Sequence, residues 1–134
     1  MSYTYLLDTN IISDLIKHPQ GRCFSKISDV GESEICTSVI VACELKFGAA
    51  KKNSPRLQER VDLILDLLPV LPLTSAVEQS YAEIRNHLEK QGTPISGNDL
   101  LIAAHARSLD LIVVTNNMRE FALVPQLKCD NWLA

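Results

Sequence analysis

The chain is poor in the features that mark several large protein classes. It has only five glycines and six prolines, no low-complexity run and no internal repeat, which argues against a solenoid or a long disordered tail. No apolar stretch approaches the roughly 18 residues that a transmembrane helix needs. The N-terminus lacks the basic segment and apolar core of a signal peptide. We therefore expect a soluble, cytoplasmic protein.

Several chemical signatures are absent as well. No Cys-x-x-Cys pair occurs among Cys23, Cys36, Cys43 and Cys129, which favours reduced, packed thiols over a zinc site or a disulfide framework. The three histidines have no compact set of further ligands at metal-binding spacing. Without a G-x-S-x-G elbow, a P-loop or a G-x-G-x-x-G segment, the chain does not fit the corresponding hydrolases, NTPases or dinucleotide enzymes.

Size and charge point to one domain and leave the partner open. A length of 134 residues with 46% hydrophobic residues suits a single domain, 1–134, built on one core. The net charge of −3 counts against a nucleic-acid binder, because phosphate backbones are usually met by an excess of Lys and Arg. A local cluster of basic residues favours nucleic-acid binding in spite of the net charge. It consists of Lys46, Lys51, Lys52, Arg56 and Arg60. A solvated helix face explains such a run equally well.

Strand and helix patterns alternate along the chain. Short apolar runs predict strands at 3–7, 34–37, 70–73 and 111–115, with a last edge strand at 127–132. Amphipathic or apolar segments predict helices at 11–17, 24–30, 39–51, 55–68, 75–90 and 98–109. Strands that are separated by helices and read as continuous apolar runs indicate a parallel sheet covered on both faces. The predicted fold class is α/β.

One helix pair has a specific expectation. The segment 39–51 is apolar nearly all round, so we expect it to be largely buried. Ser38 is placed to cap it, and Pro55 opens the next helix at a position where proline is tolerated. The two helices should form a hairpin.

Acidic and amide side chains follow predicted strands or lie on predicted buried helices. Asp8 follows the first strand, and Asn116 and Asn117 follow the strongest one. Because ligands bind outside the carboxyl ends of parallel strands, these side chains are expected to face one crevice. Glu44 has mainly apolar helical neighbours, and a buried carboxylate needs a cation or hydrogen bonds to offset its desolvation. Asp99 opens an apolar helix.

Each acid also has a plain structural explanation. A salt bridge to a distant Arg or Lys would account for Glu44, and a helix cap would account for Asp99. Taken together with Asp8, however, they offer the converging oxygen ligands that a hard divalent cation requires. Such a cation can bridge a scissile phosphate and lower the pKa of a bound water. The set therefore indicates phosphodiester hydrolysis.

Four motifs in register resemble the PIN domain: Leu6-Leu-Asp-Thr-Asn10, Ser38 to Glu44-Leu45, Gly97-Asn-Asp99 with Ile102-Ala-Ala104, and Val114-Thr-Asn-Asn117 with Arg119-Glu-Phe121. The resemblance covers essentially the whole chain, and four motifs in order are specific where any one is weak. The short length and the ending, with Val124-Pro and Asp130-Asn-Trp132, resemble VapC, the toxin family of VapBC toxin–antitoxin pairs.

The resemblance implies a three-layer α/β/α fold with a mainly parallel central sheet. It also implies an endoribonuclease dependent on Mg²⁺ or Mn²⁺. By the same resemblance, Asp8, Glu44 and Asp99 are the catalytic residues that hold the metal, with Asn10 and Thr115 as nearby supports.

The fourth acidic position departs from the family pattern. The family often has an acid just after the last core strand, whereas this chain has Asn116 and Asn117 there, with Glu120 as the nearest carboxylate. A second metal is therefore an open question. Asn117 through its carbonyl, or Glu120 through a water, would be a supporting residue at this place.

The resemblance further implies a substrate and partners. Cleavage would fall in a single-stranded RNA loop and leave a 3′-hydroxyl and a 5′-phosphate. The form of the chain is similar to the toxins that cut initiator tRNA in its anticodon loop. A homodimer and inhibition by a cognate VapB-type antitoxin are expected. Lys46 and Arg119 would contact phosphate, unless they are simply solvated.

Two other functions fit part of the pattern. A phosphatase that forms an aspartyl-phosphate generally needs Asp-x-Asp, but the second position here is Asn10. A non-catalytic domain that only binds metal or a partner would keep the acids without cleaving RNA. Cleavage of RNA distinguishes these alternatives.

Overall fold

The computed structural model describes residues 2–134, whose strands form one parallel sheet. The strands are β1 (Tyr5–Leu7), β2 (Ile35–Ser38), β3 (Val70–Leu71), β4 (Ile112–Val114) and β5 (Cys129–Asp130). Their order is β3-β2-β1-β4-β5, and every neighbouring pair is parallel. The predicted α/β class with a parallel sheet is confirmed.

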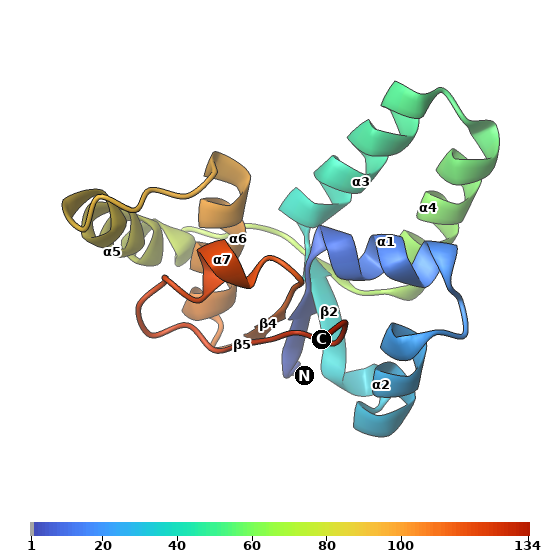
Figure 1. Ribbon diagram of the computed structural model, residues 1–134, viewed down its shortest axis with the longest axis horizontal. Helices are drawn as coiled ribbons and strands as arrows, with labels where there is room; N and C mark the ends of the chain where they lie inside the picture. The colour runs from blue at the N-terminus through green and yellow to red at the C-terminus, as the bar shows by residue number, and fades with distance from the viewer. Residues whose placement is uncertain (1) are drawn as a thin grey trace.

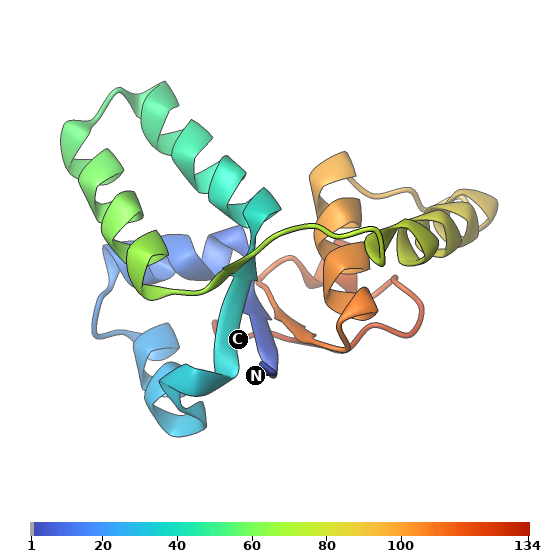
Figure 2. The same cartoon turned by 180° about the vertical axis from the view of Figure 1, so that it is seen from behind.

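Helices lie on both sides of this sheet. They are α1 (Thr9–Lys17), α2 (Arg22–Val30), α3 (Val39–Lys52), α4 (Pro55–Leu67), α5 (Val77–Lys90), α6 (Gly97–Ser108) and α7 (Met118–Phe121), with a short 3₁₀ turn at Glu32–Glu34. Figures 1 and 2 agree in placing α1 to α4 on one side of the central strands and α5 and α6 on the other. This is the expected three-layer arrangement. Within residues 2–134, no helix has the length and apolar character to span a bilayer.

The central strands β1 and β4 mark the point where the strand order reverses. The chain runs from β1 through β2 to β3 on one side and then crosses to β4 and β5 on the other. Leu7 pairs with Val114 in register, and the backbone N–H of Asp8 donates to the carbonyl of Val114 at 2.9 Å. Open parallel sheets bind ligands outside the carboxyl ends of strands at such a point. Asp8 and Thr115, which follow these two strands, therefore occupy the expected ligand site.

Buried apolar side chains hold the sheet against α6 and α7. Leu6 and Val113 are fully buried in the central strands, and Ile102 and Ala103 are fully buried on α6. Phe121 of α7 is also fully buried. Because these contacts fix the strand ends and the short helix α7, the polar residues next to them are held in place.

The helices α3 and α4 form the predicted hairpin (Figure 1), but the prediction that α3 is largely buried is wrong. Only the stripe Val41, Leu45 and Ala49 is buried on this helix. Phe47 is 67% exposed, and Cys43 is exposed as well. Packing covers one stripe of α3, and the apolar composition of a helix does not reveal how many of its sides are covered.

The predicted elements all occur, with shifted ends. Four of the five strands are shorter than predicted, most clearly the last one, where Cys129–Asp130 replaces 127–132, and β2 is shifted by one residue. All four cysteines are free thiols, as predicted, although Cys43 does not pack as a core residue. Burial raises the pKa of the Cys36 thiol to about 12, which keeps it protonated and unreactive at neutral pH.

Candidate active site

The polar residues that follow β1 and β4 line one open cavity of about 470 Å³. Asp8, Glu44 and Asp99 all contribute to its wall, from the end of β1, the middle of α3 and the first turn of α6. Asn116 and Asn117 line it too, so the expectation that they share a crevice with Asp8 is confirmed. The fold thus brings the three predicted acids to one place.

Asp8 is the most deeply placed acid, with a side chain only 3% exposed. Its Oδ1 accepts from the backbone N–H of Thr9 at 2.8 Å, and its Oδ2 accepts from Thr115 Oγ1 at 2.7 Å and from Asn10 Nδ2 at 3.2 Å. Burial raises the pKa of Asp8, these three hydrogen bonds oppose the rise, and the charge of Glu44 adds to it. Asp8 is therefore a buried carboxylate with only neutral partners.

Two of the predicted supporting residues contact Asp8 directly and connect β1 to β4. Thr115 is fully buried, and its Oγ1 also accepts from the backbone N–H of Asn117 at 2.9 Å. Asn10 donates to Thr115 Oγ1 at 3.4 Å, and its Oδ1 accepts from the backbone N–H of Asn116 at 2.8 Å. This network fixes the orientation of Asp8, because each hydroxyl and amide already has its partners.

Glu44 is held at both carboxylate oxygens. Its Oε1 accepts from the hydroxyl of Thr9, and its Oε2 accepts from Asn98 Nδ2 at 3.2 Å. The side chain is half-buried rather than buried, because α3 is covered on one stripe only. Among the described residues Glu44 forms no salt bridge, so the salt-bridge explanation is wrong.

Asp99 is not the cap of its helix. Ser96 is the N-cap of α6, and its Oγ accepts from the backbone N–H of Asp99 at 3.3 Å. The capping explanation for Asp99 is therefore wrong. Its carboxylate instead faces α7, where Oδ2 accepts from Asn117 Nδ2 at 2.8 Å.

Glu120 supplies a fourth carboxylate beside Asp99. Asn117 Nδ2 also donates to Glu120 Oε2 at 2.9 Å, and Glu120 Oε1 accepts from the backbone N–H of Ser96 at 3.0 Å. Burial, hydrogen bonding with Glu120 and the charges of Asp8 and Glu120 raise the pKa of Asp99 to about 7. Hydrogen bonding with Asp99 lowers the pKa of Glu120 in turn. Of this pair, Asp99 is therefore the carboxylate that keeps its proton to higher pH, while Glu120 ionises first.

The two bases that sequence reasoning singled out do not line this cavity. Lys46 Nζ lies 3.5 Å from Asp62 Oδ1 on the exposed side of the hairpin, and Arg119 is exposed on α7. Lys17, near the end of α1, lines the cavity instead. Sequence reasoning also missed Asn98, because its contact with Glu44 depends on how α6 packs against α3.

The donor set suits a hard cation, although it is not a preformed cage. Across residues 2–134, no three His, Cys, Asp or Glu side chains are arranged to ligate one ion. The charge of Asp8 nevertheless raises the pKa of Asp99, and neither residue has a cationic partner among the described salt bridges. Mg²⁺ is usually held by one or two carboxylates while it keeps several waters. Oxygen ligands of this kind also suit Mn²⁺, so the residues fit either ion.

Known proteins share this sequence and fold. The PIN domain family profile matches residues 5–127. Ribonuclease VapC2 of Rickettsia felis is 36% identical over 130 residues, which cover 96% of this chain and 97% of that protein. The tRNA(fMet)-specific endonuclease VapC of Shigella flexneri is 34% identical over 129 residues, which cover 96% and 97%.

A solved structure agrees with this assignment. The crystal structure of VapBC2 from Rickettsia felis bound to a promoter DNA fragment has a TM-score of 0.90 and 34% identity to this chain. The match covers 96% of this chain and 98% of that one. The chain therefore belongs to the PIN domain family, and within it to the VapC ribonucleases.

Proposed function

We propose that this chain is a Mg²⁺- or Mn²⁺-dependent endoribonuclease that cleaves tRNA, with the anticodon loop of initiator tRNA as the favoured target. The products would carry a 5′-phosphate and a 3′-hydroxyl. The observation that carries the proposal is the convergence of Asp8, Glu44 and Asp99 on one cavity where the strand order reverses. The name of the Shigella flexneri relative, a tRNA(fMet)-specific endonuclease, supports the substrate.

Asp8 and Asp99 are the residues that would hold the ion, with Glu44 and Glu120 close by. Such an ion, when bound, supplies positive charge against the scissile phosphate and makes water a better nucleophile. Thr115 and Asn10 keep the carboxylate of Asp8 in one orientation. This fixed orientation lets the site bind an ion without reorganising.

In this proposal Glu44, which the family resemblance also assigns to the metal, accepts a proton. Thr9 and Asn98 each occupy one of its oxygens, and an ionised carboxylate keeps further acceptor positions beyond these two hydrogen bonds. The side chain lines the same cavity as Asp8 and Asp99. Glu44 can therefore orient an attacking water and accept its proton.

The aspartyl-phosphate alternative is less well supported. Asp8 has both oxygens hydrogen-bonded and is 3% exposed, which disfavours attack by this carboxylate on a phosphate. The second acid that such an enzyme needs is replaced by Asn10, whose amide is engaged with Asp8 and Asn116. Direct hydrolysis by water fits these contacts better.

The proposal is tested by cleavage of purified initiator tRNA, with an elongator tRNA as the matched control. Each RNA is incubated with the protein in Mg²⁺, in Mn²⁺ and in EDTA, and the new ends are mapped by their ability to ligate. We expect metal-dependent cuts in the anticodon loop of the initiator tRNA that leave 5′-phosphates. No cleavage of either RNA by folded, metal-binding protein would contradict the proposal and favour a non-catalytic interaction domain.

We further propose that the chain acts in the cytoplasm as a homodimer held inactive by a VapB-type antitoxin. The structural neighbours from Rickettsia felis and Salmonella typhimurium are VapBC structures, which supports the antitoxin. The test is co-expression with a VapB-type antitoxin, sought as a short open reading frame next to the gene of this chain. Purification of a complex that does not cut RNA, and release of cleavage when the partner is removed, is the expected result.

The repulsion among the acids can be tested by thermal stability, without measuring RNA cleavage. The pKa of Asp99 is about 7 in the folded chain, against an ordinary value of 3.8, so between these values the folded state holds a proton that the unfolded state has released. The stability of the metal-free protein should therefore fall as pH rises from about 4 to 7. In EDTA at pH 8, we expect Asp99→Asn to have a higher Tm than the wild type.

The same comparison has internal controls. At pH 5 the Tm difference should shrink, because protonated Asp99 is then as neutral as asparagine. Mg²⁺ should raise the Tm of the wild type at pH 8 more than that of Asp99→Asn. Asp66→Asn, at an exposed position of α4, is the matched control and should change neither value. A variant that is less stable than the wild type at pH 8 in EDTA would argue against repulsion among the acids.

A further inference from the structure

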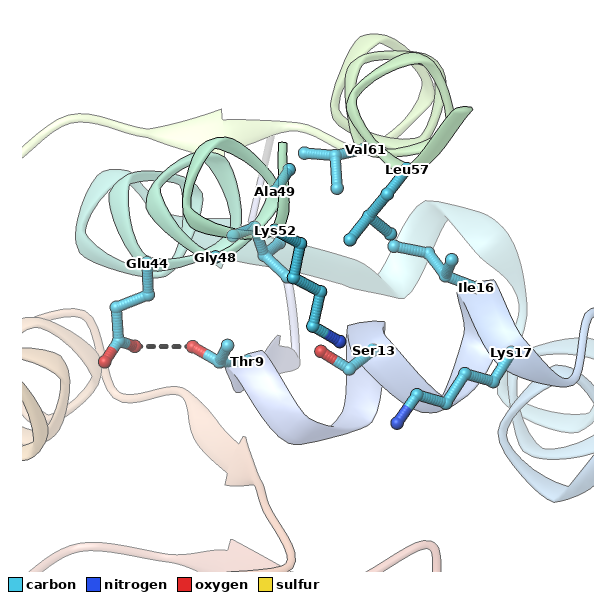
Figure 3. A pocket seen from close by; sticks show the side chains of 11 residues that line it. Thr9, Ser13, Ile16, Lys17, Glu44, Gly48, Ala49, Lys52, Leu57 and Val61 are labelled. Carbon is cyan, nitrogen blue, oxygen red and sulfur yellow. Dashed lines mark hydrogen bonds between the residues drawn. The ribbon is translucent and has the colours of Figure 1, made fainter. Parts of the chain in front are cut away.

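A second cavity adjoins the acidic one and extends from it between α1 and the α3–α4 hairpin. This groove has a volume of about 200 Å³ (Figure 3). Thr9 and Glu44 line both cavities, so the two lie side by side, with the hydrogen bond from Thr9 to Glu44 at their boundary. The floor of the groove is apolar and is formed by Ile16, Leu45, Leu57 and Val61. An RNA strand that leaves the acidic cavity on this side would pass over the Thr9–Glu44 hydrogen bond and reach the groove.

Gly48 lines this groove and contributes no side chain to it. It lies inside α3, one turn after Glu44, where glycine destabilises a helix relative to alanine. A Cβ added at Gly48 would meet nothing within 4 Å, and the residue has no positive φ. Neither packing nor backbone conformation therefore requires glycine here. A glycine that lowers helix stability and leaves space in the groove suggests that a ligand uses this space.

Two lysines stand at the mouth of the groove. Lys17 ends α1 and Lys52 ends α3, and both line the groove. Figure 3 shows Lys52 extending toward Ser13 of α1, with Lys17 on the same side. Within residues 2–134 neither lysine forms a salt bridge, whereas Lys46 on the other side of α3 does. Asp14 lines the neighbouring acidic cavity, as Lys17 also does.

We propose that this groove binds the nucleotide adjacent to the scissile phosphate, an inference that rests on the proposed RNA cleavage. The base lies on the apolar floor, and Lys17 and Lys52 bind its phosphate. Free ammonium groups above an apolar floor match a nucleotide, which joins a phosphate to a flat ring. The lysines also offset the negative field of the acids along the path that the RNA takes.

The test measures RNA binding in EDTA, where cleavage is not expected, by the fluorescence anisotropy of a labelled single-stranded oligonucleotide. Gly48→Leu fills the groove, and we expect it to weaken binding about fivefold or more, since one base can no longer enter. Gly48→Ala is the matched control: it should raise the Tm and weaken binding less. Lys17→Ala with Lys52→Ala should reduce the slope of log K against log salt by about 0.7 for each phosphate that is no longer neutralised. Lys51→Ala, on α3 but outside the groove, should leave both values unchanged.

The possible outcomes distinguish a failure of the nucleotide proposal from a failure of the proposed RNA cleavage. If folded Gly48→Leu binds the oligonucleotide as tightly as the wild type, the groove does not hold a nucleotide. If it keeps RNA binding and loses inhibition by the antitoxin, the groove holds a segment of the protein partner and the nucleotide proposal is wrong. If the wild type neither binds nor cuts RNA under any metal condition, the proposed function fails together with this inference.

Discussion

Replacing Asp8 by asparagine should abolish RNA cleavage while leaving the fold intact. In the proposed mechanism Asp8 holds the ion, so its replacement would take away several kcal/mol of charge stabilisation. This corresponds to a fall in kcat/KM of roughly a thousandfold or more. The fold should survive because asparagine has nearly the same shape and its single side-chain oxygen can still accept from Thr115 and Asn10, while only the hydrogen bond from the backbone N–H of Thr9 is lost. Cleavage rates and Tm in EDTA, measured on the same preparation, check both parts.

The direction in which Asp8→Asn changes the Tm tests whether the buried charge of Asp8 destabilises the metal-free protein. Burial raises the pKa of Asp8, so its charged form is disfavoured in the folded protein without metal. Asp8→Asn should therefore have a Tm in EDTA at least as high as that of the wild type, and it should lose most of the stabilisation by Mg²⁺. Asp66→Asn serves again as the control at an exposed acid. Wild-type cleavage by folded Asp8→Asn would remove Asp8 from the catalytic set.

Thr115→Val should weaken both cleavage and stability. Valine keeps the shape of threonine but removes the donor to Asp8 Oδ2 and the acceptor for the backbone N–H of Asn117. Because Thr115 is fully buried, unpaired groups there cost about 1–3 kcal/mol of unfolding free energy. Removing the orienting partner of a metal-holding residue typically lowers activity about 10- to 100-fold. Chemical denaturation and the dependence of the cleavage rate on Mg²⁺ concentration measure these effects.

Thr115→Ser distinguishes the orienting role of the Thr115 hydroxyl from the packing of its methyl group. Thr115→Ser keeps the hydroxyl and removes only the methyl group, so it should retain most of the cleavage activity and need no more Mg²⁺ than the wild type. Thr115→Val should need more Mg²⁺ to reach half of its own maximal rate. If the valine variant is destabilised but shows wild-type Mg²⁺ dependence, Thr115 supports the fold alone.

Much of the fold was predictable because the hydrophobic pattern carries it. Continuous apolar runs such as 111–115 are typical of central parallel strands, and Ser38 and Pro55 marked helix starts that the structure contains. The burial of α3 was not predictable. Whether Phe47 is covered depends on how neighbouring elements pack, and its exposed position follows from tertiary arrangement rather than from local sequence.

The candidate site was predictable in its acids and less so in what surrounds them. Asp8 was placed by the strand end, and Asp99 by its position at a helix start. The contact of Asn98 with Glu44 joins α6 to α3, and no local pattern encodes the angle between two helices. The groove lined by Gly48 was not predicted for the same reason. A glycine inside an apolar helix shows that it borders open space only once the neighbouring elements are known.

Anomalous diffraction from crystals soaked in Mn²⁺ would show whether the acids form the metal site, with crystals of Asp8→Asn treated in the same way. We expect an anomalous peak in the acidic cavity, in contact with the carboxylates of Asp8 and Asp99, and its disappearance in the variant. A peak elsewhere, or none at a Mn²⁺ concentration that supports RNA cleavage, would contradict the assignment of these acids as the metal site.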